Sequence, residues 1–399
     1  MTYGREGIYL DHAATTPVDP GVVERMLPFF SEHFGNPSSI YQLGQEGRAA
    51  IDRARRQCAA VLGCAPSEIV FTSGATESDN LALRGAVDAW RRDHGGERRP
   101  HLVISAVEHH AVLDTALSLI EGDVDLDIVP VDASGRVDPA NVAAVMRPET
   151  CLVSVMLANN EIGTIQPVPE IAAIASERGV PMHTDAVQAA GLLDLSVNRL
   201  GVDMLALSAH KFYGPKGIGL LYVRKGTRIA WQQHGGGQES GRRGGTENVP
   251  LIVGMGEALQ RAENLRGQYA DHCRTLRDSM WERLRASLPD TLRNGTVDPE
   301  HALPNILNVV LPGIQGETML LNLDLLNIAA SAGSACTTGN AEPSHVVRAI
   351  GRSDQKARST IRFSVGRGNS LDEMDAAVAA VAEAAARVRA LSGTVSAAG

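Results

Sequence analysis

The sequence lacks any long apolar run. No stretch of about 18 or more apolar residues, the length that a membrane-spanning helix needs, occurs in its 399 residues. The amino-terminal segment M-T-Y-G-R-E-G-I-Y-L-D-H also lacks the apolar core of a signal peptide. We therefore expect a cytoplasmic protein that has no contact with a membrane.

An excess of positive charge is also missing. The chain has 37 Lys and Arg residues against 46 Asp and Glu residues, which gives a formal net charge of -9. Proteins that bind polyanions over a broad surface carry the opposite balance, because they neutralise phosphate groups with lysine and arginine. We expect no direct nucleic-acid partner.

Cysteine is scarce and scattered. The five cysteines are separated widely along the chain, and no C-x-x-C pair occurs among them: Cys58, Cys64, Cys151, Cys273 and Cys336. A disulfide framework and a structural zinc site both need closely spaced or paired cysteines, so neither is indicated, and we expect no metal site. Cys58 and Cys64 fit best as small packed side chains. Cys336 differs, because it lies in a run of small residues, S-A-G-S-A-C-T-T-G-N, that predicts an exposed, mobile loop.

The two common nucleotide-binding loops, G-x-x-x-x-G-K-[ST] and G-x-G-x-x-G, are absent. A different phosphate site is possible after the β-branched run that begins at Ile69, where S-G-A-T-E-S-D-N forms a small-residue turn before a helix through Trp90. Free backbone amides at such a helix start, with the Thr76 hydroxyl beside them, can hold a phosphate. An ordinary capped turn between a strand and a helix is the alternative.

Strand and helix patterns alternate through the first half of the chain. Apolar runs predict strands at Leu102–Ala106, Asp127–Val131, Cys151–Leu157, Val180–Thr184, Met204–Leu207 and Ile218–Val223. Helical spacing predicts helices at Pro20–Phe30, Gln45–Leu62, Val112–Leu119, Pro139–Val145 and Pro169–Arg178. This order is typical of an α/β protein with a mostly parallel sheet, whose ligand site lies at the carboxyl ends of the strands.

Polar segments follow four of these predicted strands: Glu108-His109-His110, Asn159-Asn160-Glu161, Asp185-Ala186-Val187-Gln188 and Ser208-Ala209-His210-Lys211. Because the carboxyl ends of parallel strands meet at one edge of the sheet, we expect the four segments to converge. A lysine in such a place can form a Schiff base with a carbonyl cofactor once its pKa is lowered from its usual value.

The second half has a different pattern. A glycine-dense loop, Gln233–Thr246, serves either as a flexible connector or as a second anion contact through Arg243 and Thr246. A long helical stretch follows from about Val249 to Leu288, then strands at Asn305–Leu311 and Thr360–Val365. Ser370 and Glu373 form a capping box for a final helix that runs to about Leu391.

Taken together, these motifs resemble a known family. They are G-A-T-E-S-D-N, E-H-H-A-V-L-D, N-N-E-I-G-T, H-T-D-A-V-Q, S-A-H-K-F-Y-G-P-K-G and G-S-A-C-T-T-G, in that order between Leu10 and about Arg367. The set resembles cysteine desulfurases of the NifS/IscS type, which are pyridoxal-phosphate enzymes of the class V aminotransferase group. The resemblance implies the fold-type I architecture, with a large α/β domain over residues 15–260. A smaller α+β domain would comprise residues 1–14 and 261–399 and carry the cysteine loop at about 330–345.

The resemblance also implies roles for single residues. Lys211 would hold pyridoxal 5'-phosphate as a Schiff base and move protons, and Asp185 would pair with the cofactor's ring nitrogen. His109 would stack on the ring and donate a proton, Gln188 would contact the ring hydroxyl, and Cys336 would attack the substrate sulfur. The remaining implied contacts are Ala75, Thr76, Ser208, His210 and, from a second subunit, Thr246 for the phosphate, Asn160 for cofactor and substrate, and Arg362 for the substrate carboxylate.

The implied reaction converts L-cysteine to L-alanine and leaves a persulfide on Cys336 in a homodimeric enzyme. The sulfur acceptor would be an iron–sulfur scaffold or a tRNA-thiolation enzyme. The chain ends in A-L-S-G-T-V-S-A-A-G, without the aromatic and charged docking segment of the iron–sulfur assembly members, so the acceptor stays open. A selenocysteine lyase or an aminotransferase is the enzymatic alternative, and a degenerate sulfur-relay protein is the non-enzymatic one.

Overall fold

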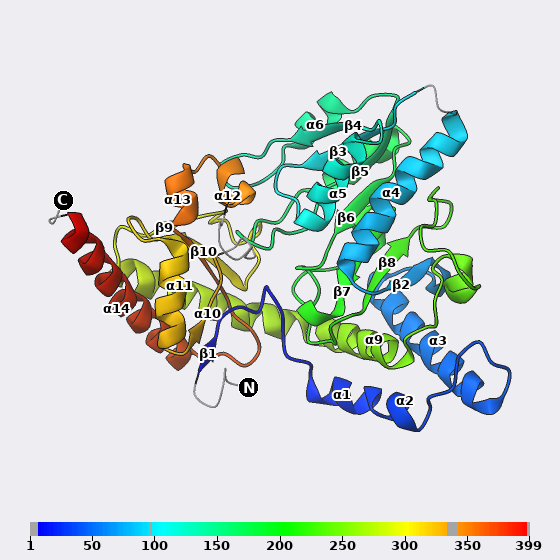
Figure 1. Ribbon diagram of the computed structural model, residues 1–399, viewed down its shortest axis with the longest axis horizontal. Coiled ribbons are helices and arrows are strands. Elements are labelled where there is room, and N and C mark those ends of the chain that lie inside the picture. Colours follow the sequence, from blue (N-terminus) through cyan, green and yellow to red (C-terminus); the bar gives the residue numbers. More distant parts are fainter. Residues whose placement is uncertain (1–6, 96–97, 333–341, 397–399) are drawn as a thin grey trace.

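A seven-stranded sheet forms the centre of the computed structural model, which describes residues 7–95, 98–332 and 342–396 (Figure 1). Its strands are β2 (Ile69–Thr72), β3 (His101–Ser105), β4 (Asp125–Val129), β5 (Thr150–Ser154), β6 (Met182–Asp185), β7 (Met204–Ser208) and β8 (Gly219–Val223). They lie in the order β2-β8-β7-β6-β5-β3-β4. Only β8 runs against its neighbours β7 and β2, while the other adjacent pairs in this sheet are parallel. The predicted mostly parallel sheet is therefore confirmed.

Helices cover both faces of this sheet because successive side chains of a strand point to opposite faces. On β2, Phe71 packs into one hydrophobic cluster and its neighbour Val70 into another. The first cluster is completed by α3 (Gln42–Leu62), α6 (Pro139–Val145), α7 (Val168–Glu177), α8 (Val197–Leu200) and α9 (Val249–Asn264). The second is completed by α4 (Ala75–His94) and α5 (His110–Ile120).

A separate hydrophobic cluster is built around a smaller antiparallel sheet, in which β10 (Ile306–Val310) lies between β9 (Leu292–Arg293) and β12 (Thr360–Ser364). Nearby, β1 (Ile8–Tyr9) pairs in parallel with β11 (Ile328–Ala329), so the start of the chain lies beside residues 320 positions later. The helices of this part are α10 (Arg266–Ser287), α11 (Gly316–Leu325), α12 (His345–Ala349), α13 (Asp354–Arg358) and α14 (Leu371–Ser396). The predicted domain boundary near residue 260 stays a prediction; it agrees with the membership of α9 and α10 in different clusters.

Two predicted helices are each divided in the structure. The helix expected from Val249 to Leu288 is interrupted at Leu265, where α9 ends and α10 begins. The helix expected from Pro20 to Phe30 is two short helices, α1 (Pro20–Met26) and α2 (Pro28–Ser31). Pro28 explains the second division, because its ring nitrogen has no hydrogen to donate and its ring crowds the preceding turn.

The capping box predicted for the last helix is confirmed. The Glu373 amide donates to Ser370 Oγ at 3.2 Å, and the Ser370 amide donates to Glu373 Oε2 at 3.1 Å. Across the described ranges, none of the helices combines the length and the apolar character needed to cross a bilayer.

Candidate active site

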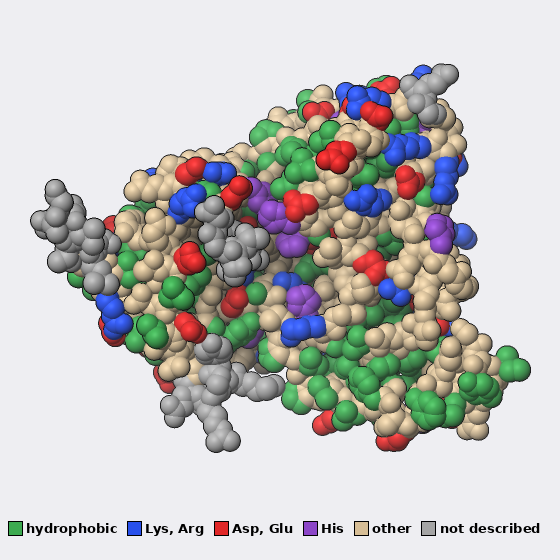
Figure 2. All heavy atoms as spheres, viewed as in Figure 1, with side chains coloured by type: hydrophobic (Ala, Val, Ile, Leu, Met, Phe, Trp, Pro, Cys, Tyr) green, Lys and Arg blue, Asp and Glu red, His purple; other side chains and the backbone are tan. Residues whose placement is uncertain are grey.

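A cavity of about 800 Å³ lies at the carboxyl ends of the parallel strands, and Figure 2 shows histidine side chains gathered around a hollow on this face. The four polar segments predicted to converge do so here. Predicted site residues that line the cavity are Ala75, Thr76, His109, Asn160, Asp185, Gln188, Ser208, His210, Lys211 and Arg362. Thr246 does not line it, and Cys336 lies outside the described residues.

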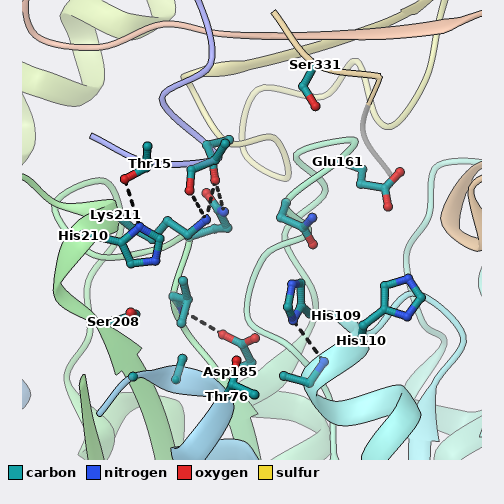
Figure 3. Close-up of a pocket in the computed structure, with 18 of the residues that line it drawn as sticks. Thr15, Thr76, His109, His110, Glu161, Asp185, Ser208, His210, Lys211 and Ser331 are labelled. Atoms are coloured by element: carbon teal, nitrogen blue, oxygen red, sulfur yellow. Dashed lines mark hydrogen bonds between the residues drawn. The ribbon is translucent and has the colours of Figure 1, made fainter. Parts of the chain in front are cut away.

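Lys211 stands on a short turn directly after β7, and its side chain extends into the cavity (Figure 3). Its Nζ donates hydrogen bonds to the carbonyl oxygens of Ala13 and Ala14, both at 2.7 Å. Burial lowers the pKa of Lys211 to about 8, and the nearby Arg362 cation adds to this effect. An amine with this pKa is partly neutral at physiological pH and can attack a carbonyl carbon.

Asp185 is the last residue of β6 and lies at the floor of the cavity. Its Oδ1 accepts a hydrogen bond from the Val187 amide at 2.9 Å. Burial raises the pKa of Asp185, while His109, the Val187 amide and Lys211 oppose the rise by favouring the carboxylate. A buried carboxylate of this kind needs a cationic partner, because an uncompensated charge in a protein interior costs several kcal/mol.

His109 precedes α5, and its ring lies in the cavity near Asp185 (Figure 3). The Ala111 amide donates to His109 Nδ1 at 3.1 Å, so Nδ1 carries no proton and the neutral ring carries it on Nε2. Burial lowers the pKa of His109, which favours this neutral form. The side chain can therefore stack on a planar ligand and donate a hydrogen bond from Nε2.

The start of α4 forms one wall of the cavity. Its first residues, Ala75 and Thr76, follow Gly74, which has no side chain to cap the helix. Ser208 and His210 approach from the end of β7, and His210 Nδ1 lies 3.1 Å from Thr15 Oγ1. Hydroxyls, an imidazole and a helix start with unfilled amides are the donors that a phosphate group requires.

Arg362 comes from β12 of the smaller sheet, and its side chain is 4% exposed. Its Nη2 donates to Asp11 Oδ1 at 2.7 Å and its Nη1 to the Asn160 carbonyl at 2.9 Å. Within the described chain its Nε has no hydrogen-bond partner. Gln188, which also lines the cavity, donates from Nε2 to the Ala13 carbonyl at 3.0 Å.

Thr246 lines a second, smaller cavity of about 190 Å³, which shares Ser73 and Gly217 with the first. The loop that carries it is held in place, because Arg243 Nε donates to Glu77 Oε1 at 3.0 Å. Arg243 is therefore engaged by a carboxylate in this chain, and the predicted role of Thr246 from a second subunit stays a prediction.

The cysteine loop begins and ends at the first cavity. Ala332, the last described residue before Cys336, lines the cavity, as does His345 after it. Ser344 donates from Oγ to Glu161 Oε2 at 2.6 Å, and His345 donates from Nε2 to the Glu108 carbonyl at 2.9 Å.

Several residues that line the cavity had no assigned role in the sequence analysis: Asp11, Asp79, Glu108, Glu161 and His345. Glu108 and Glu161 stand at polar strand ends, a signal that indicated their place but not their function. Burial raises the pKa of Glu108 to about 8, although Ser105 and the Met156 amide donate hydrogen bonds to its Oε1. Asp11 and His345 come from segments far away in the sequence, so only folding brings them here.

Fold and site define an α/β enzyme in which a lysine of lowered pKa and a buried carboxylate face an anion-binding wall. Residues 8–377 match the family model for aminotransferase class-V. The chain belongs to this family of pyridoxal-phosphate enzymes and, within it, to the cysteine desulfurases.

Two relatives and two solved structures illustrate the similarity. The chain is 44% identical over 391 residues to the putative cysteine desulfurase IscS 1 of Bacillus subtilis strain 168, covering 96% of this chain and 100% of that protein. It is 45% identical to the cysteine desulfurase IscS of Methanosarcina thermophila, and the match covers 97% of this chain and 94% of that protein. The structure of a NifS-like protein superposes with a TM-score of 0.88 at 37% identity, and the match covers 95% of this chain and 99% of that one. The structure of SspA in complex with cysteine superposes with a TM-score of 0.76 at 38% identity, and the match covers 90% of this chain and 98% of that one.

The residues present fit pyridoxal phosphate. The cavity offers an amine of lowered pKa at Lys211 for the aldehyde and a buried carboxylate at Asp185 for the ring nitrogen. The uncapped start of α4 offers donors for the phosphate. No group of metal-ligating side chains occurs within the described ranges.

Proposed function

We propose that this protein converts L-cysteine to L-alanine and transfers the sulfur to Cys336 as a persulfide. The observation that carries the proposal is the meeting of Lys211, Asp185 and Arg362 in one cavity with the two ends of the cysteine loop. When bound, pyridoxal phosphate supplies an electron sink for the bond broken at the substrate's Cα.

Arg362 and Asn160 bind the substrate carboxylate in this proposal. A planar guanidinium pairs with two carboxylate oxygens, and Arg362 has an unused Nε beside the two nitrogens held by Asp11 and the Asn160 carbonyl. Because Arg362 projects from β12 and Lys211 from the end of β7, the carboxylate binds on the side of the cavity formed by the smaller sheet.

Lys211 and His109 move protons. In this proposal the lysine amine, with a pKa of about 8, takes the proton from the substrate's Cα, and His109, whose Nδ1 is occupied by the Ala111 amide, donates its proton from Nε2. In the cofactor-free chain both groups are held by contacts to backbone atoms, Lys211 by two carbonyls and His109 by the Ala111 amide.

Cys336 completes the reaction as nucleophile. Its thiolate attacks the substrate sulfur, so that the Cβ–S bond breaks, an S–S bond forms and Cβ receives a proton. L-Cysteine and the Cys336 thiol thus become L-alanine and a persulfide with no external oxidant. The four other cysteines are poor candidates, because burial raises the pKa of Cys58, Cys64, Cys151 and Cys273 to about 12.

The protein acts as a homodimer in this proposal. Exposed apolar side chains cluster around α1, α2 and the following loop: Leu27, Phe30, Phe34, Ile40 and Tyr41. Figure 2 shows hydrophobic side chains gathered in this region. A hollow of about 350 Å³ beside them is lined by both Phe34 and Thr246. A second copy that covers the apolar residues therefore contacts Thr246, which supports its role in the partner's phosphate site.

The persulfide sulfur then passes to an acceptor protein, either an iron–sulfur scaffold or a tRNA-thiolation enzyme, in the cytoplasm.

The test measures alanine and protein-bound persulfide from L-cysteine in the purified protein, in Cys336→Ala and in Cys64→Ala as the matched control. We expect Cys336→Ala to lose persulfide and at least about 100-fold of alanine formation, because the nucleophile is gone. The visible absorbance of the bound cofactor should stay, and Cys64→Ala should behave like the parent. Full alanine formation without persulfide in Cys336→Ala would instead indicate a lyase or a transaminase.

A further inference from the structure

A pair of polar side chains that the proposed mechanism does not use is buried near Asp185. Asp79 on α4 and His183 on β6 are both fully buried, and Asp79 Oδ1 lies 3.4 Å from His183 Nε2. Neither Asp79 oxygen nor His183 Nε2 has a hydrogen-bond partner within the described chain. On its other side, His183 Nδ1 lies 2.8 Å from Ser154 Oγ. Asp79 also touches the cavity, and the steps proposed above do not use it.

The surroundings of Asp79 disfavour a negative charge. A buried carboxylate that accepts no hydrogen bonds is strongly disfavoured, and the charges of two nearby carboxyl groups, Asp185 and Glu108, repel it. Burial, followed by the repulsion from Asp185 and then Glu108, raises the pKa of Asp79 well above its usual value. Burial lowers the pKa of His183 to about 3, so the imidazole is neutral and supplies no compensating charge.

Asp185 is stabilised as an anion by contacts that Asp79 does not have. The Val187 amide donates to its Oδ1, and His109 and Lys211 favour its charged form. Of the two aspartates, Asp185 is thus the one that the structure equips to carry the negative charge.

We propose that Asp79 is a protonated carboxylic acid in the folded protein, hydrogen-bonded to neutral His183, and that this pair leaves Asp185 as the ionised carboxylate at the cavity floor. The Asp79 hydroxyl then donates to His183 Nε2, and His183 Nδ1 donates to Ser154 Oγ. This assignment gives a partner to Asp79 Oδ1 and to His183 Nε2, which otherwise lack one. Asp79 and His183 are positioning residues, since they act on the cofactor through Asp185. That last step rests on the proposed function, whereas the protonation of Asp79 does not.

The proton on Asp79 can be measured without the reaction. A carboxyl group with a raised folded pKa favours the folded state fully below its unfolded pKa of about 3.9 and loses that contribution as the pH rises toward the folded value. Asp79→Asn removes this pH-dependent loss of folding stability, because the amide is neutral at every pH. We would compare the unfolding equilibrium constants of cofactor-free parent and Asp79→Asn in urea between about pH 5 and about pH 7.

We expect the ratio of parent to variant unfolding constants to rise about tenfold per pH unit, equivalent to about 1.4 kcal/mol. Asp88→Asn is the matched control on the same helix, where the side chain is exposed and contacts Gln232. The ratio of the parent's unfolding constant to that of Asp88→Asn should stay constant across this pH range. A constant ratio for Asp79→Asn as well would mean that Asp79 is ionised in the folded protein and would overturn the proposal.

Two further measurements separate the possible failures. With bound pyridoxal phosphate, the pH titration of the visible absorbance should be the same in parent and Asp79→Asn, because one neutral group replaces another. A shift toward lower pH would mean that a negative charge had been removed, against the proposal.

If the variant does not fold, infrared spectra of the parent with isotope-labelled aspartate should show a protonated carboxyl band at neutral pH, and its absence would overturn the proposal. A protein that binds no cofactor would refute the proposed function but leave the unfolding comparison valid.

Discussion

Lys211 shows how a common surface residue becomes a reactive group. Its burial removes the stabilisation that water gives to an ammonium ion, and Arg362 adds repulsion, so its pKa falls to about 8. The carbonyls of Ala13 and Ala14 hold its Nζ in place. Because these carbonyls belong to the segment that also contributes Asp11 to Arg362, the start of the chain positions both the amine and the guanidinium.

The pKa of Lys211 predicts the pH dependence of cofactor attachment. Only the neutral amine attacks an aldehyde, so the rate at which the cofactor-free protein binds pyridoxal phosphate should rise with pH and level off above about pH 8. Stopped-flow absorbance would measure this rate. Lys211→Ala should give no stable visible band at any pH, and a rate that is the same at pH 6 and pH 9 would contradict the assignment.

Arg362 supports a prediction about substrate binding. Arg362→Lys keeps the charge but loses the planar fork that Asp11 and the Asn160 carbonyl hold. We expect kcat/KM for L-cysteine to fall at least about tenfold, mostly through KM, because a charged hydrogen bond contributes about 1.5–3 kcal/mol. Arg348→Lys, at an exposed ion pair with Asp354, is the control and should leave the kinetics unchanged. An unaltered KM in Arg362→Lys would place the carboxylate elsewhere.

At the scale of elements, one buried ion pair fixes the glycine-rich loop before α9. Glu239 accepts from Arg55 Nη1 at 3.0 Å and from Arg55 Nη2 at 2.5 Å, and it also accepts from the Phe71 amide at 3.0 Å. The loop is thereby joined to α3 and β2. From the sequence, this loop was either a flexible connector or an anion contact. In the structure, Glu239 holds it to α3 and β2, and Arg243 holds it to α4.

Removing Glu239 should cost stability. Glu239→Ala leaves the largely buried Arg55 cation and the Phe71 amide without their partner, so we expect a loss of about 3 kcal/mol in the free energy of unfolding. Urea titration would measure it. Glu383→Ala removes an exposed helical pair with Arg387 and should change stability by less than about 0.5 kcal/mol. Equal effects of the two variants would mean that the Glu239 pair contributes no more than a surface contact.

At the scale of the whole molecule, the exposed aromatic residues of α2 and the adjoining loop predict the assembly state. Phe30 and Phe34 are 60% and 66% exposed. If a second copy covers them, the double variant Phe30→Ser and Phe34→Ser should be a monomer in sedimentation at micromolar concentration and should bind pyridoxal phosphate more weakly, because the partner's Thr246 is lost. Leu321→Ser with Leu325→Ser, at exposed leucines on α11, is the control and should stay dimeric. A monomeric parent would refute the homodimer.

Much of the fold was predictable because its signals are local. Apolar runs marked the strands, the capping box at Ser370 marked the start of α14, and the order of strands and helices indicated a mostly parallel sheet. The errors were local as well: Pro28 divides one predicted helix, and Leu265 divides another where the chain passes from one hydrophobic cluster to the next.

The sequence by itself determined the residue types of the site, since polar groups that follow parallel strands must share one edge of the sheet. Tertiary structure alone decided which charges these groups carry. The lowered pKa of Lys211, the raised pKa of Glu108 and the unpartnered oxygens of Asp79 result from burial among segments that are distant in the sequence. Desolvation and charge interactions depend on distance in space, so no pattern along the chain could have indicated them.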